Sequence, residues 1–256
     1  MIELQQVSFG YGGGFAARDW NLTLEDHSLT AVIGENGSGK TTLLRLLAGE
    51  LRPREGRILL DGRDTASLPK RALARSLSYF PQGRPIPDMT VEEVVSLGRY
   101  PHVGARGERT PAERQRILFA MERAGVASFA SRPVRELSYG ERQRVYLAMQ
   151  LAQDANHCLF DEPTNFLDAA AAFSMLEQLR ALAGEGRCVL CVLHDLSLAM
   201  QYAHRILLLH GGRLVADGTP EQIDASGAVE EYLGVALRRV ETSNGAVYAV
   251  TPGHRV

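Results

Sequence analysis

The chain has 256 residues, of which 45% are hydrophobic and 23% charged, and its formal net charge is −2. These values are ordinary for a soluble globular protein with a sizeable core, in one large domain or two small ones. The charge balance indicates no nucleic-acid partner. The sequence has no apolar run of transmembrane length, and its polar, strand-like start does not read as a signal peptide. We therefore expect a cytosolic protein whose role at a membrane, if any, depends on a partner.

The first ninety residues read mainly as strands. Residues 3–9 alternate apolar and polar side chains, which predicts a half-buried antiparallel strand. An apolar, helix-periodic segment closed by Gly49 predicts one helix, at 43–48. Further strands are predicted at 20–24, 29–33, 57–60 and 77–80.

The character of the chain changes to helices at Thr90. Thr90 and Thr110 each precede a glutamate by three residues, which is the pattern of a helix-capping box. Pro111 would occupy the first position of the second helix. Residues 90 to about 131 are therefore the best candidate for an inserted helical subdomain.

The second half alternates helices with apolar strands, which favours a largely parallel α/β core. The turn His210-Gly211-Gly212 predicts a hairpin between the strands that flank it. Predicted helices lie at 141–153, 169–183, 196–203 and 228–233, and predicted strands at 158–161, 189–193, 205–209 and 213–216, with two short ones around 243–245.

The three cysteines are Cys158, Cys188 and Cys191. The last two form a C-x-x-C pattern, which can indicate a metal or redox site. They lie in an apolar run typical of a buried strand, where they would point to opposite faces, and there is no second cysteine pair. We expect core cysteines.

The segment 34–42 fits the phosphate-binding pattern G-x-x-x-x-G-K-[ST], between a predicted strand and a predicted helix. Its glycines let backbone N–H groups turn inward on a triphosphate, and the helix N-terminus adds partial positive charge. Lys40 can reach the β and γ phosphates, and the Thr41 hydroxyl can ligate Mg²⁺. The residues expected to bind nucleotide are Gly34, Asn36, Gly37, Ser38, Gly39, Lys40, Thr41 and Thr42.

Two carboxylates, Asp161 and Glu162, end the predicted strand 158–161. Asp161 can hold Mg²⁺ through water beside Thr41, and Glu162 can act as a base on the attacking water or orient it. Together with the phosphate-binding loop, this pair predicts an NTPase.

The segment 137–144, Leu-Ser-Tyr-Gly-Glu-Arg-Gln-Arg, is a Ser/Gly turn that opens a helix and could bind a second anion. A helical insert would keep it from folding back on its own phosphate-binding loop. It is therefore expected to serve the nucleotide of another molecule.

Leu137-Ser138-Tyr139-Gly140-Glu141 resembles the L-S-G-G-Q signature of ATP-binding cassette (ABC) proteins, and its position between the other two motifs matches as well. The resemblance covers essentially the whole chain. It implies one nucleotide-binding domain over 1–256, with an α/β P-loop NTPase (RecA-like) fold. A parallel core and an antiparallel β subdomain would take about 1–89 and 157–256, and a helical subdomain about 90–156.

The resemblance also implies roles for residues outside these motifs. Tyr11 falls where an aromatic residue stacks on adenine, and Gln82 matches a glutamine that contacts Mg²⁺ and the attacking water. His194 matches a histidine that contacts the γ-phosphate. Ser138 and Gly140 would approach the nucleotide of a second copy, and Asp168 belongs to a loop that crosses between the two sites. The departures from the family pattern are Tyr139 and Glu141, which replace glycine and glutamine, and Asn165, where serine is common.

The segment 91–102, with Gly98-Arg99-Tyr100-Pro101-His102, looks like the corresponding part of importers of iron-siderophores, haem and cobalamin. The resemblance implies an ATPase subunit with ATP and Mg²⁺ as cofactors, which pairs with a second copy and drives polytopic permease subunits from the cytoplasmic face of the inner membrane. A substrate-binding protein would be an indirect partner. Another importer class and a soluble iron–sulfur assembly ATPase remain as alternatives.

Overall fold

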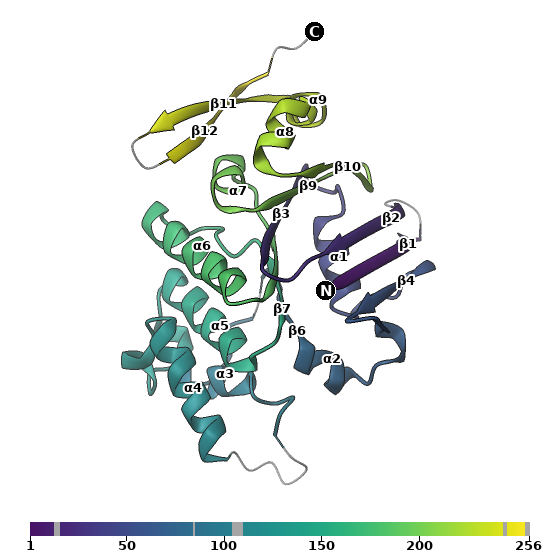
Figure 1. Cartoon of the computed structure of the whole chain (residues 1–256). Coiled ribbons are helices and arrows are strands. Elements are labelled where there is room, and N and C mark those ends of the chain that lie inside the picture. Colours follow the sequence, from purple (N-terminus) through teal and green to yellow (C-terminus); the bar gives the residue numbers. More distant parts are fainter. Residues whose placement is uncertain (13–15, 84, 104–109, 243–244, 254–256) are drawn as a thin grey trace.

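The computed structural model describes residues 1–12, 16–83, 85–103, 110–242 and 245–253 (Figure 1). Its centre is a six-stranded sheet in the order β10-β9-β3-β8-β7-β6. β9, β3, β8, β7 and β6 run parallel, and β10 is antiparallel to β9. The strands are β3 (Ser28–Gly34), β6 (Leu77–Phe80), β7 (His157–Asp161), β8 (Cys188–Val192), β9 (Arg205–His210) and β10 (Arg213–Gly218). The predicted parallel core is confirmed.

A four-stranded antiparallel sheet in the order β2-β1-β4-β5 packs beside this core. It consists of β1 (Ile2–Gly10), β2 (Ala16–Leu24), β4 (Glu55–Leu60) and the two-residue β5 (Arg63–Asp64). Trp20 joins it to the core, because its buried indole Nε1 donates to the carbonyl of Gly212 at 3.0 Å. The prediction of an antiparallel first strand is confirmed.

Helices cover both faces of the central sheet (Figure 1). One apolar cluster packs α3, α4, α5, α6 and α7 on one face, and a second packs α1 and the antiparallel sheet on the other. The helices are α1 (Lys40–Leu47), α2 (Lys70–Ser76), α3 (Val91–Leu97), α4 (Pro111–Arg123), α5 (Tyr139–Gln153), α6 (Ala169–Gly184), α7 (Leu196–Tyr202), α8 (Pro220–Ser226) and α9 (Ala228–Leu233), followed by the hairpin of β11 (Val235–Thr242) and β12 (Gly245–Pro252).

The three cysteines are buried and free, as predicted. Cys158 and Cys191 belong to the cluster on the helical face, and Cys188 belongs to the cluster on the opposite face. The alternation of side chains along a strand thus separates the two members of the C-x-x-C pattern.

The segment after α3 holds this helix against α5. A Cβ atom at Gly98 would lie 2.1 Å from the carbonyl oxygen of Met149, so only glycine lets α3 approach α5 this closely. The buried Arg99 donates to the carbonyl of Ala152 at 2.7 Å, and His102 Nε2 lies 2.9 Å from the carbonyl of Gln153. Both contacts satisfy carbonyls at the end of α5, which has no intrahelical donors for them.

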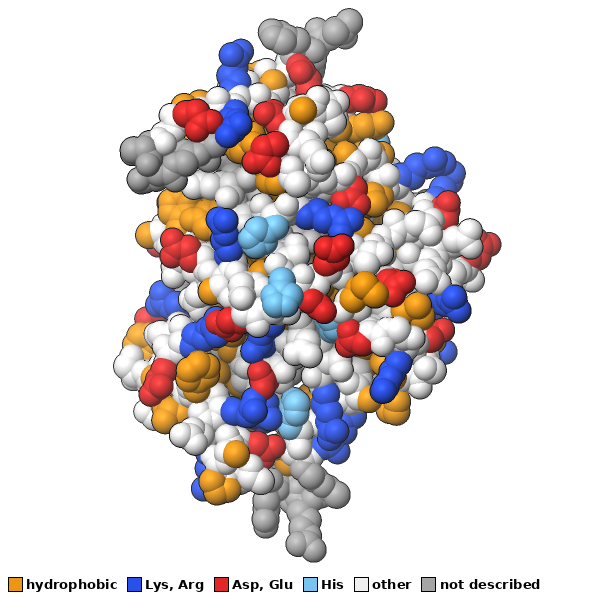
Figure 2. Space-filling view, viewed as in Figure 1, with side chains coloured by type: hydrophobic (Ala, Val, Ile, Leu, Met, Phe, Trp, Pro, Cys, Tyr) orange, Lys and Arg blue, Asp and Glu red, His pale blue; other side chains and the backbone are white. Residues whose placement is uncertain are grey.

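Two helices were not predicted. α2 is short and buries only Leu73, so it lacks a periodic apolar face. The sequence does carry a signal for the start of α8: Thr219 and Gln222 form a capping box, and Pro220 occupies the first helical position. Within the described residues, no helix is long and apolar enough to cross a membrane. Figure 2 shows acidic and basic side chains interspersed over one face of the molecule.

Candidate functional site

The phosphate-binding loop connects the end of β3 to the start of α1, as the sequence predicts. Gly34, Gly37 and Gly39 have φ angles of +149°, +80° and +111°. A Cβ atom at Gly34 would lie 2.2 Å from the carbonyl oxygen of Leu209, so packing against β9 as well as backbone conformation requires glycine there. The loop therefore presents its amides as a rigid cradle at the N-terminus of a helix.

A cavity of about 270 Å³ opens at this loop. Tyr11, directly after β1, lines it with its ring packed edge-to-face on Phe9 at a centroid distance of 4.9 Å. The other lining residues are Asn36, Gly37, Gly39, Lys40, Thr41, Thr42 and Glu162. Six of the predicted nucleotide-binding residues of the loop thus line one cavity with Tyr11, and Ser38 is buried beneath it.

Lys40 supplies the positive charge of this cavity. Its Nζ donates to the carbonyl oxygens of Gly34 and Glu35 at 2.8 and 2.9 Å. Burial lowers the pKa of Lys40, while the charges of Glu162 and Asp161 act in the opposite direction. A partly desolvated ammonium held among backbone dipoles is suited to receive a phosphate anion.

Asp161 ends β7 and is 1% exposed. Its Oδ2 accepts a hydrogen bond from the Tyr79 hydroxyl at 3.4 Å, and its Oδ1 has no hydrogen-bond partner among the residues that the structure describes. Burial raises the pKa of Asp161, and the nearby Thr41 hydroxyl opposes this rise. A buried carboxylate oxygen without a partner beside a threonine hydroxyl fits a hard cation such as Mg²⁺.

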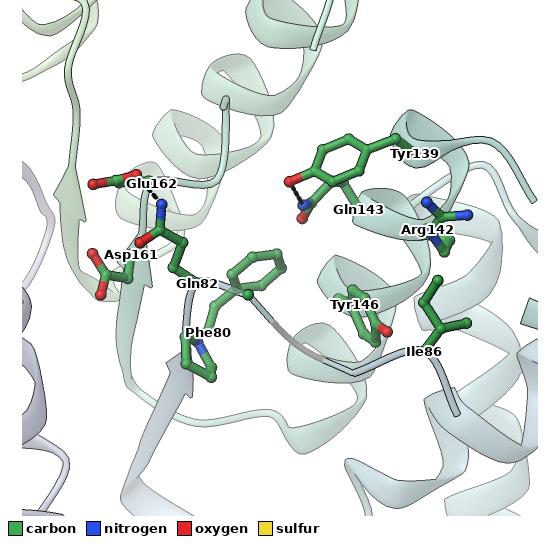
Figure 3. Close-up of a pocket in the computed structure, with 11 residues that line it drawn as sticks. Phe80, Gln82, Ile86, Tyr139, Arg142, Gln143, Tyr146, Asp161 and Glu162 are labelled. Carbon is green, nitrogen blue, oxygen red and sulfur yellow. Dashed lines mark hydrogen bonds between the residues drawn. The ribbon is translucent and has the colours of Figure 1, made fainter. Parts of the chain in front are cut away.

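Glu162 follows at once and adopts φ of +53°, which is uncommon for a residue other than glycine. Its carboxylate accepts hydrogen bonds from the side-chain amides of Gln82 and Asn165, and it pairs with His194 Nε2. Gln82 reaches it from the segment after β6 (Figure 3). The structure thus brings together all three predicted catalytic residues at the edge of the cavity, with Glu162 9% exposed.

Sequence reasoning missed Asn165 as a member of this cluster and noted it only as a departure from the family pattern. The available signal was its spacing, three residues after Glu162. The backbone N–H of Asn165 also donates to the Glu162 carbonyl at 3.2 Å, which closes the turn that points both side chains the same way.

Ser138, Gly140 and Asp168 do not line the cavity at the phosphate-binding loop in the described structure. Ser138 caps α5: its Oγ accepts from the Glu141 amide, and its own amide donates to Glu141 Oε2 at 2.7 Å. Glutamate therefore serves the cap as well as glutamine would. Asp168 caps α6 by accepting from the Ala171 amide at 2.8 Å.

Tyr139 lines a second cavity of about 150 Å³ with Gln82 and Glu162 (Figure 3). Its hydroxyl accepts from Gln143 Nε2 at 2.7 Å. Phe166, which is 84% exposed, packs edge-to-face on the Tyr139 ring at 5.7 Å. An aromatic surface therefore stands beside the start of α5.

Comparison with known proteins gives consistent matches. A family model described as ABC transporter matches residues 17–165. The ferric enterobactin transport ATP-binding protein FepC of Escherichia coli (strain K12) is 34% identical over 250 residues, which cover 97% of this chain and 92% of that protein. The hemin import ATP-binding protein HmuV of Pseudomonas entomophila (strain L48) is 38% identical over 241 residues, which cover 92% of this chain and 93% of that protein.

Among solved structures, a metal-chelate type ABC transporter in an inward-facing conformation superimposes with a TM-score of 0.85. The two chains are 25% identical, and the match covers 99% of this chain and 98% of the other. The family model spans more than half of the sequence, and the two relatives span nearly all of it. Their agreement establishes that the chain belongs to the ABC transporter family, as one of its ATP-hydrolysing subunits.

Proposed function

We propose that this ATPase powers the import of a metal chelate, a ferric siderophore or haem, through separate membrane permease subunits. Support comes from the names of two relatives, which refer to ferric enterobactin transport and hemin import, and from a structural neighbour of the metal-chelate type. The segment from Gly98 to His102, which resembles this group of importers, is also built into the packing between α3 and α5.

The single observation that carries the chemistry is the buried Glu162, held by Gln82, Asn165 and His194 at the rim of the phosphate-binding cavity. We infer that Glu162 accepts the proton of the attacking water and that Gln82 and His194 orient it toward the γ-phosphate. Lys40 and the loop amides bind the triphosphate, and Tyr11 stacks on the base.

Thr41, Asp161 and Gln82 would hold Mg²⁺. Bound there, the cation neutralises charge that develops on the β and γ phosphates. The buried Oδ1 of Asp161 supports this assignment, because a ligand would satisfy an oxygen that has no partner among the described residues.

A second copy of the chain would complete each site through Ser138 and Gly140. Gly140 lies in the first turn of α5, and the nearest atom to a Cβ placed there, a methyl carbon of Leu167, is at 3.6 Å. Packing within the chain therefore does not require glycine at this helical position, where it weakens the helix. Close approach of another molecule's phosphate would explain it, and Asp168 would lie where the two copies cross.

The permease would contact the helical part of the chain, residues 90–156, which we treat as a subdomain beside the core formed by 1–89 and 157–256. A groove of about 410 Å³ lies where this part meets the core, and it is lined by Leu73 and Leu77 of the core and by Met149 of α5. A short amphipathic helix of the permease fits such a groove. The ATPase would then sit peripherally on the cytoplasmic face of the inner membrane, with a substrate-binding protein on the far side.

The test is to purify the Glu162→Gln chain with Mg-ATP from membranes of its own organism and to identify what accompanies it. We expect a polytopic membrane protein in stoichiometric amount. In proteoliposomes, the complex with the unaltered chain should then take up a ferric siderophore or haem when ATP is supplied.

The alternatives give different results. A chain that brings down no membrane protein would favour an iron–sulfur assembly ATPase and would overturn the import proposal. Cobalamin is tested as a third cargo. A membrane complex that transports none of the three compounds would point to another importer class.

A further inference from the structure

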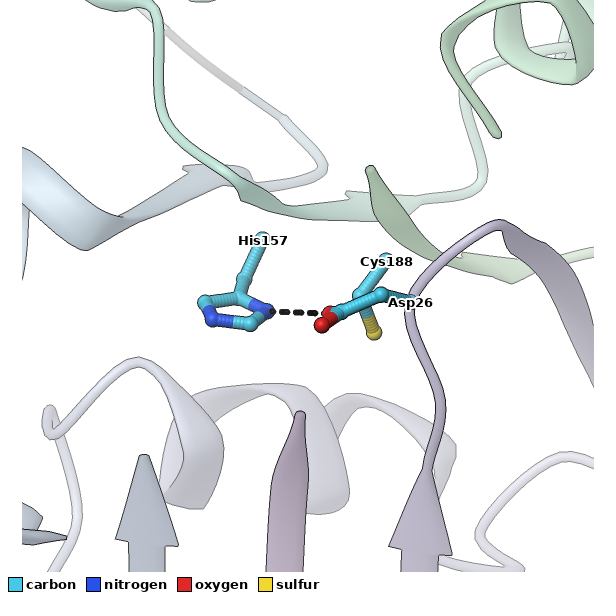
Figure 4. Close-up of side chains that lie close together, drawn as sticks. All are labelled: Asp26, His157 and Cys188. Atoms are coloured by element: carbon cyan, nitrogen blue, oxygen red, sulfur yellow. Dashed lines mark ion pairs between the residues drawn. The ribbon is translucent and has the colours of Figure 1, made fainter. Parts of the chain in front are cut away.

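The amino ends of the parallel strands gather a second cluster of reactive side chains, at the edge of the sheet opposite to the nucleotide site. His157 begins β7 and Cys188 begins β8, and the two residues are register partners across these strands. Asp26 lies in the turn that leads into β3, whose first residue, Ser28, also pairs with Cys188. Sheet register therefore sets His157 and Cys188 side by side, with Asp26 next to them (Figure 4).

A ligand atom from each of Asp26, His157 and Cys188 lies within 4.8 Å of the other two. His157 and Cys188 are each 1% exposed, whereas the Asp26 side chain is 45% exposed. The distance from His157 Nδ1 to Asp26 Oδ1 is 3.7 Å, too long for a hydrogen bond. It is close to the roughly 3.3–3.7 Å that separates neighbouring ligands around tetrahedral zinc at the usual zinc–nitrogen, zinc–oxygen and zinc–sulfur distances.

The orientation of His157 is fixed from its other side. His157 Nε2 lies 3.2 Å from each oxygen of Asp61. A carboxylate can only accept, so Nε2 carries the proton and donates, and Nδ1 keeps its lone pair. Nδ1 is buried and has no hydrogen-bond partner among the residues described. A histidine that donates to a carboxylate while its second nitrogen faces other ligand groups is the arrangement seen around protein-bound metals.

We propose that Asp26, His157 and Cys188 bind a divalent transition-metal ion of the zinc class, with Asp61 as the positioning residue behind His157. One thiolate, one imidazole and one carboxylate make a mixed donor set suited to Zn²⁺, and water takes the fourth tetrahedral position. On binding, the Cys188 thiol releases its proton to solvent as the sulfur–metal bond forms. The Met1 amine, which donates to Asp26 at 2.9 Å and to Asp61 at 2.9 Å, faces the same carboxylates and competes with the cation.

This site is separate from the nucleotide site. β7 places His157 at its start and Asp161 at its end, a separation of about 13 Å at the usual rise per residue of a strand. A bound ion would join the starts of β7 and β8 to the turn before β3. These three strands lead, at their other ends, to Glu162, His194 and the phosphate-binding loop.

The experiment is to titrate the full-length chain with Co²⁺ in excess Mg²⁺, which fills the hard-ligand site. The readout is the near-ultraviolet charge-transfer absorption that only a thiolate ligand produces. We expect one Co²⁺ per chain to give this band, and Zn²⁺ to displace it. Cys188→Ser should abolish the band, and Asp26→Asn should weaken Co²⁺ binding at least tenfold.

Cys191→Ser is the matched control, because Cys191 is a buried cysteine of the same strand that faces the other apolar cluster. It should leave the band unchanged. The half-exposed Asp26 tests the site even if Cys188→Ser fails to fold, which circular dichroism reports. A wild-type chain without the band, or equal Co²⁺ binding by wild type and Asp26→Asn, overturns the proposal.

Discussion

Replacing Glu162 with glutamine exchanges one carboxylate oxygen for an amide nitrogen in a side chain of the same shape. The remaining oxygen can still accept from Gln82 and Asn165, which both donate to Oε2 in the native chain. The new amide can donate to His194 Nε2, which lies against Oε1. Since every contact has a counterpart, we expect the variant to fold normally and to lose only the base and its charge.

The expected loss of turnover follows from that missing base. General-base catalysis contributes about 10²–10⁴ in rate, or roughly 3–5 kcal/mol of activation free energy. Binding of Mg-ATP should persist, because the phosphate-binding loop is untouched and a negative charge beside the cavity is removed. Phosphate release at saturating Mg-ATP measures the first effect. Equilibrium titration measures the binding of Mg-ATP. Gel filtration measures the oligomeric state, and the stalled protein should accumulate as dimers.

Glu177→Gln provides the control, since Glu177 is an exposed glutamate on α6 and its variant should hydrolyse ATP normally. Turnover of Glu162→Gln within tenfold of the wild type would remove Glu162 from the role of base. A variant that fails to bind Mg-ATP although it is folded would refute the argument that binding and hydrolysis use separate groups.

Lys40→Ala should weaken ATP binding about 10–100-fold in titration calorimetry, because one charge-assisted contact to phosphate is lost; an unchanged affinity would contradict the loop assignment. Gly140→Ala should retain or slightly raise the thermal midpoint but slow hydrolysis, and normal turnover would show that nothing approaches this residue. Gly98→Ala, by contrast, should lower the midpoint by several degrees in a melting curve, because its Cβ would overlap an α5 carbonyl; a midpoint equal to wild type would contradict the packing. Mixtures of Ser138→Arg chains with Glu162→Gln chains should show activity that departs from the sum of the two chains measured separately, whereas strictly additive activity would rule out shared sites.

The sequence predicted the parallel strands of the central sheet well because each is a largely apolar run, and burial on both faces leaves that signal undiluted. It predicted α3 and α4 because Thr90 and Thr110 carry complete capping boxes, which the structure confirms. It missed α2, whose single buried residue gives no periodicity. It also missed α8, although Thr219 and Pro220 carry the same capping signal.

For the site, local motifs identified the loop, Asp161 and Glu162, and the family resemblance added Gln82 and His194. The contact of Asn165 with Glu162 depends on the left-handed turn at Glu162, which no residue preference announces. The hydrogen bond from the Tyr79 hydroxyl to Asp161 depends on strands β6 and β7 lying side by side, and this pairing comes from tertiary packing. Such contacts are invisible to motif and periodicity reasoning.

Helix α5 has a mechanical consequence. Its 15 residues make a rod about 22 Å long, with Ser138 at one tip and Gln153 near the other. The far tip is clamped by Arg99 and His102 and borders the groove that contains Met149. A packed helix resists bending. A displacement that a neighbouring subunit imposes at the Gln153 end would therefore move the Ser138 end as well. The rigidity of α5 would then couple transport of the cargo to enclosure of the nucleotide, and no hinge within the helix would be needed.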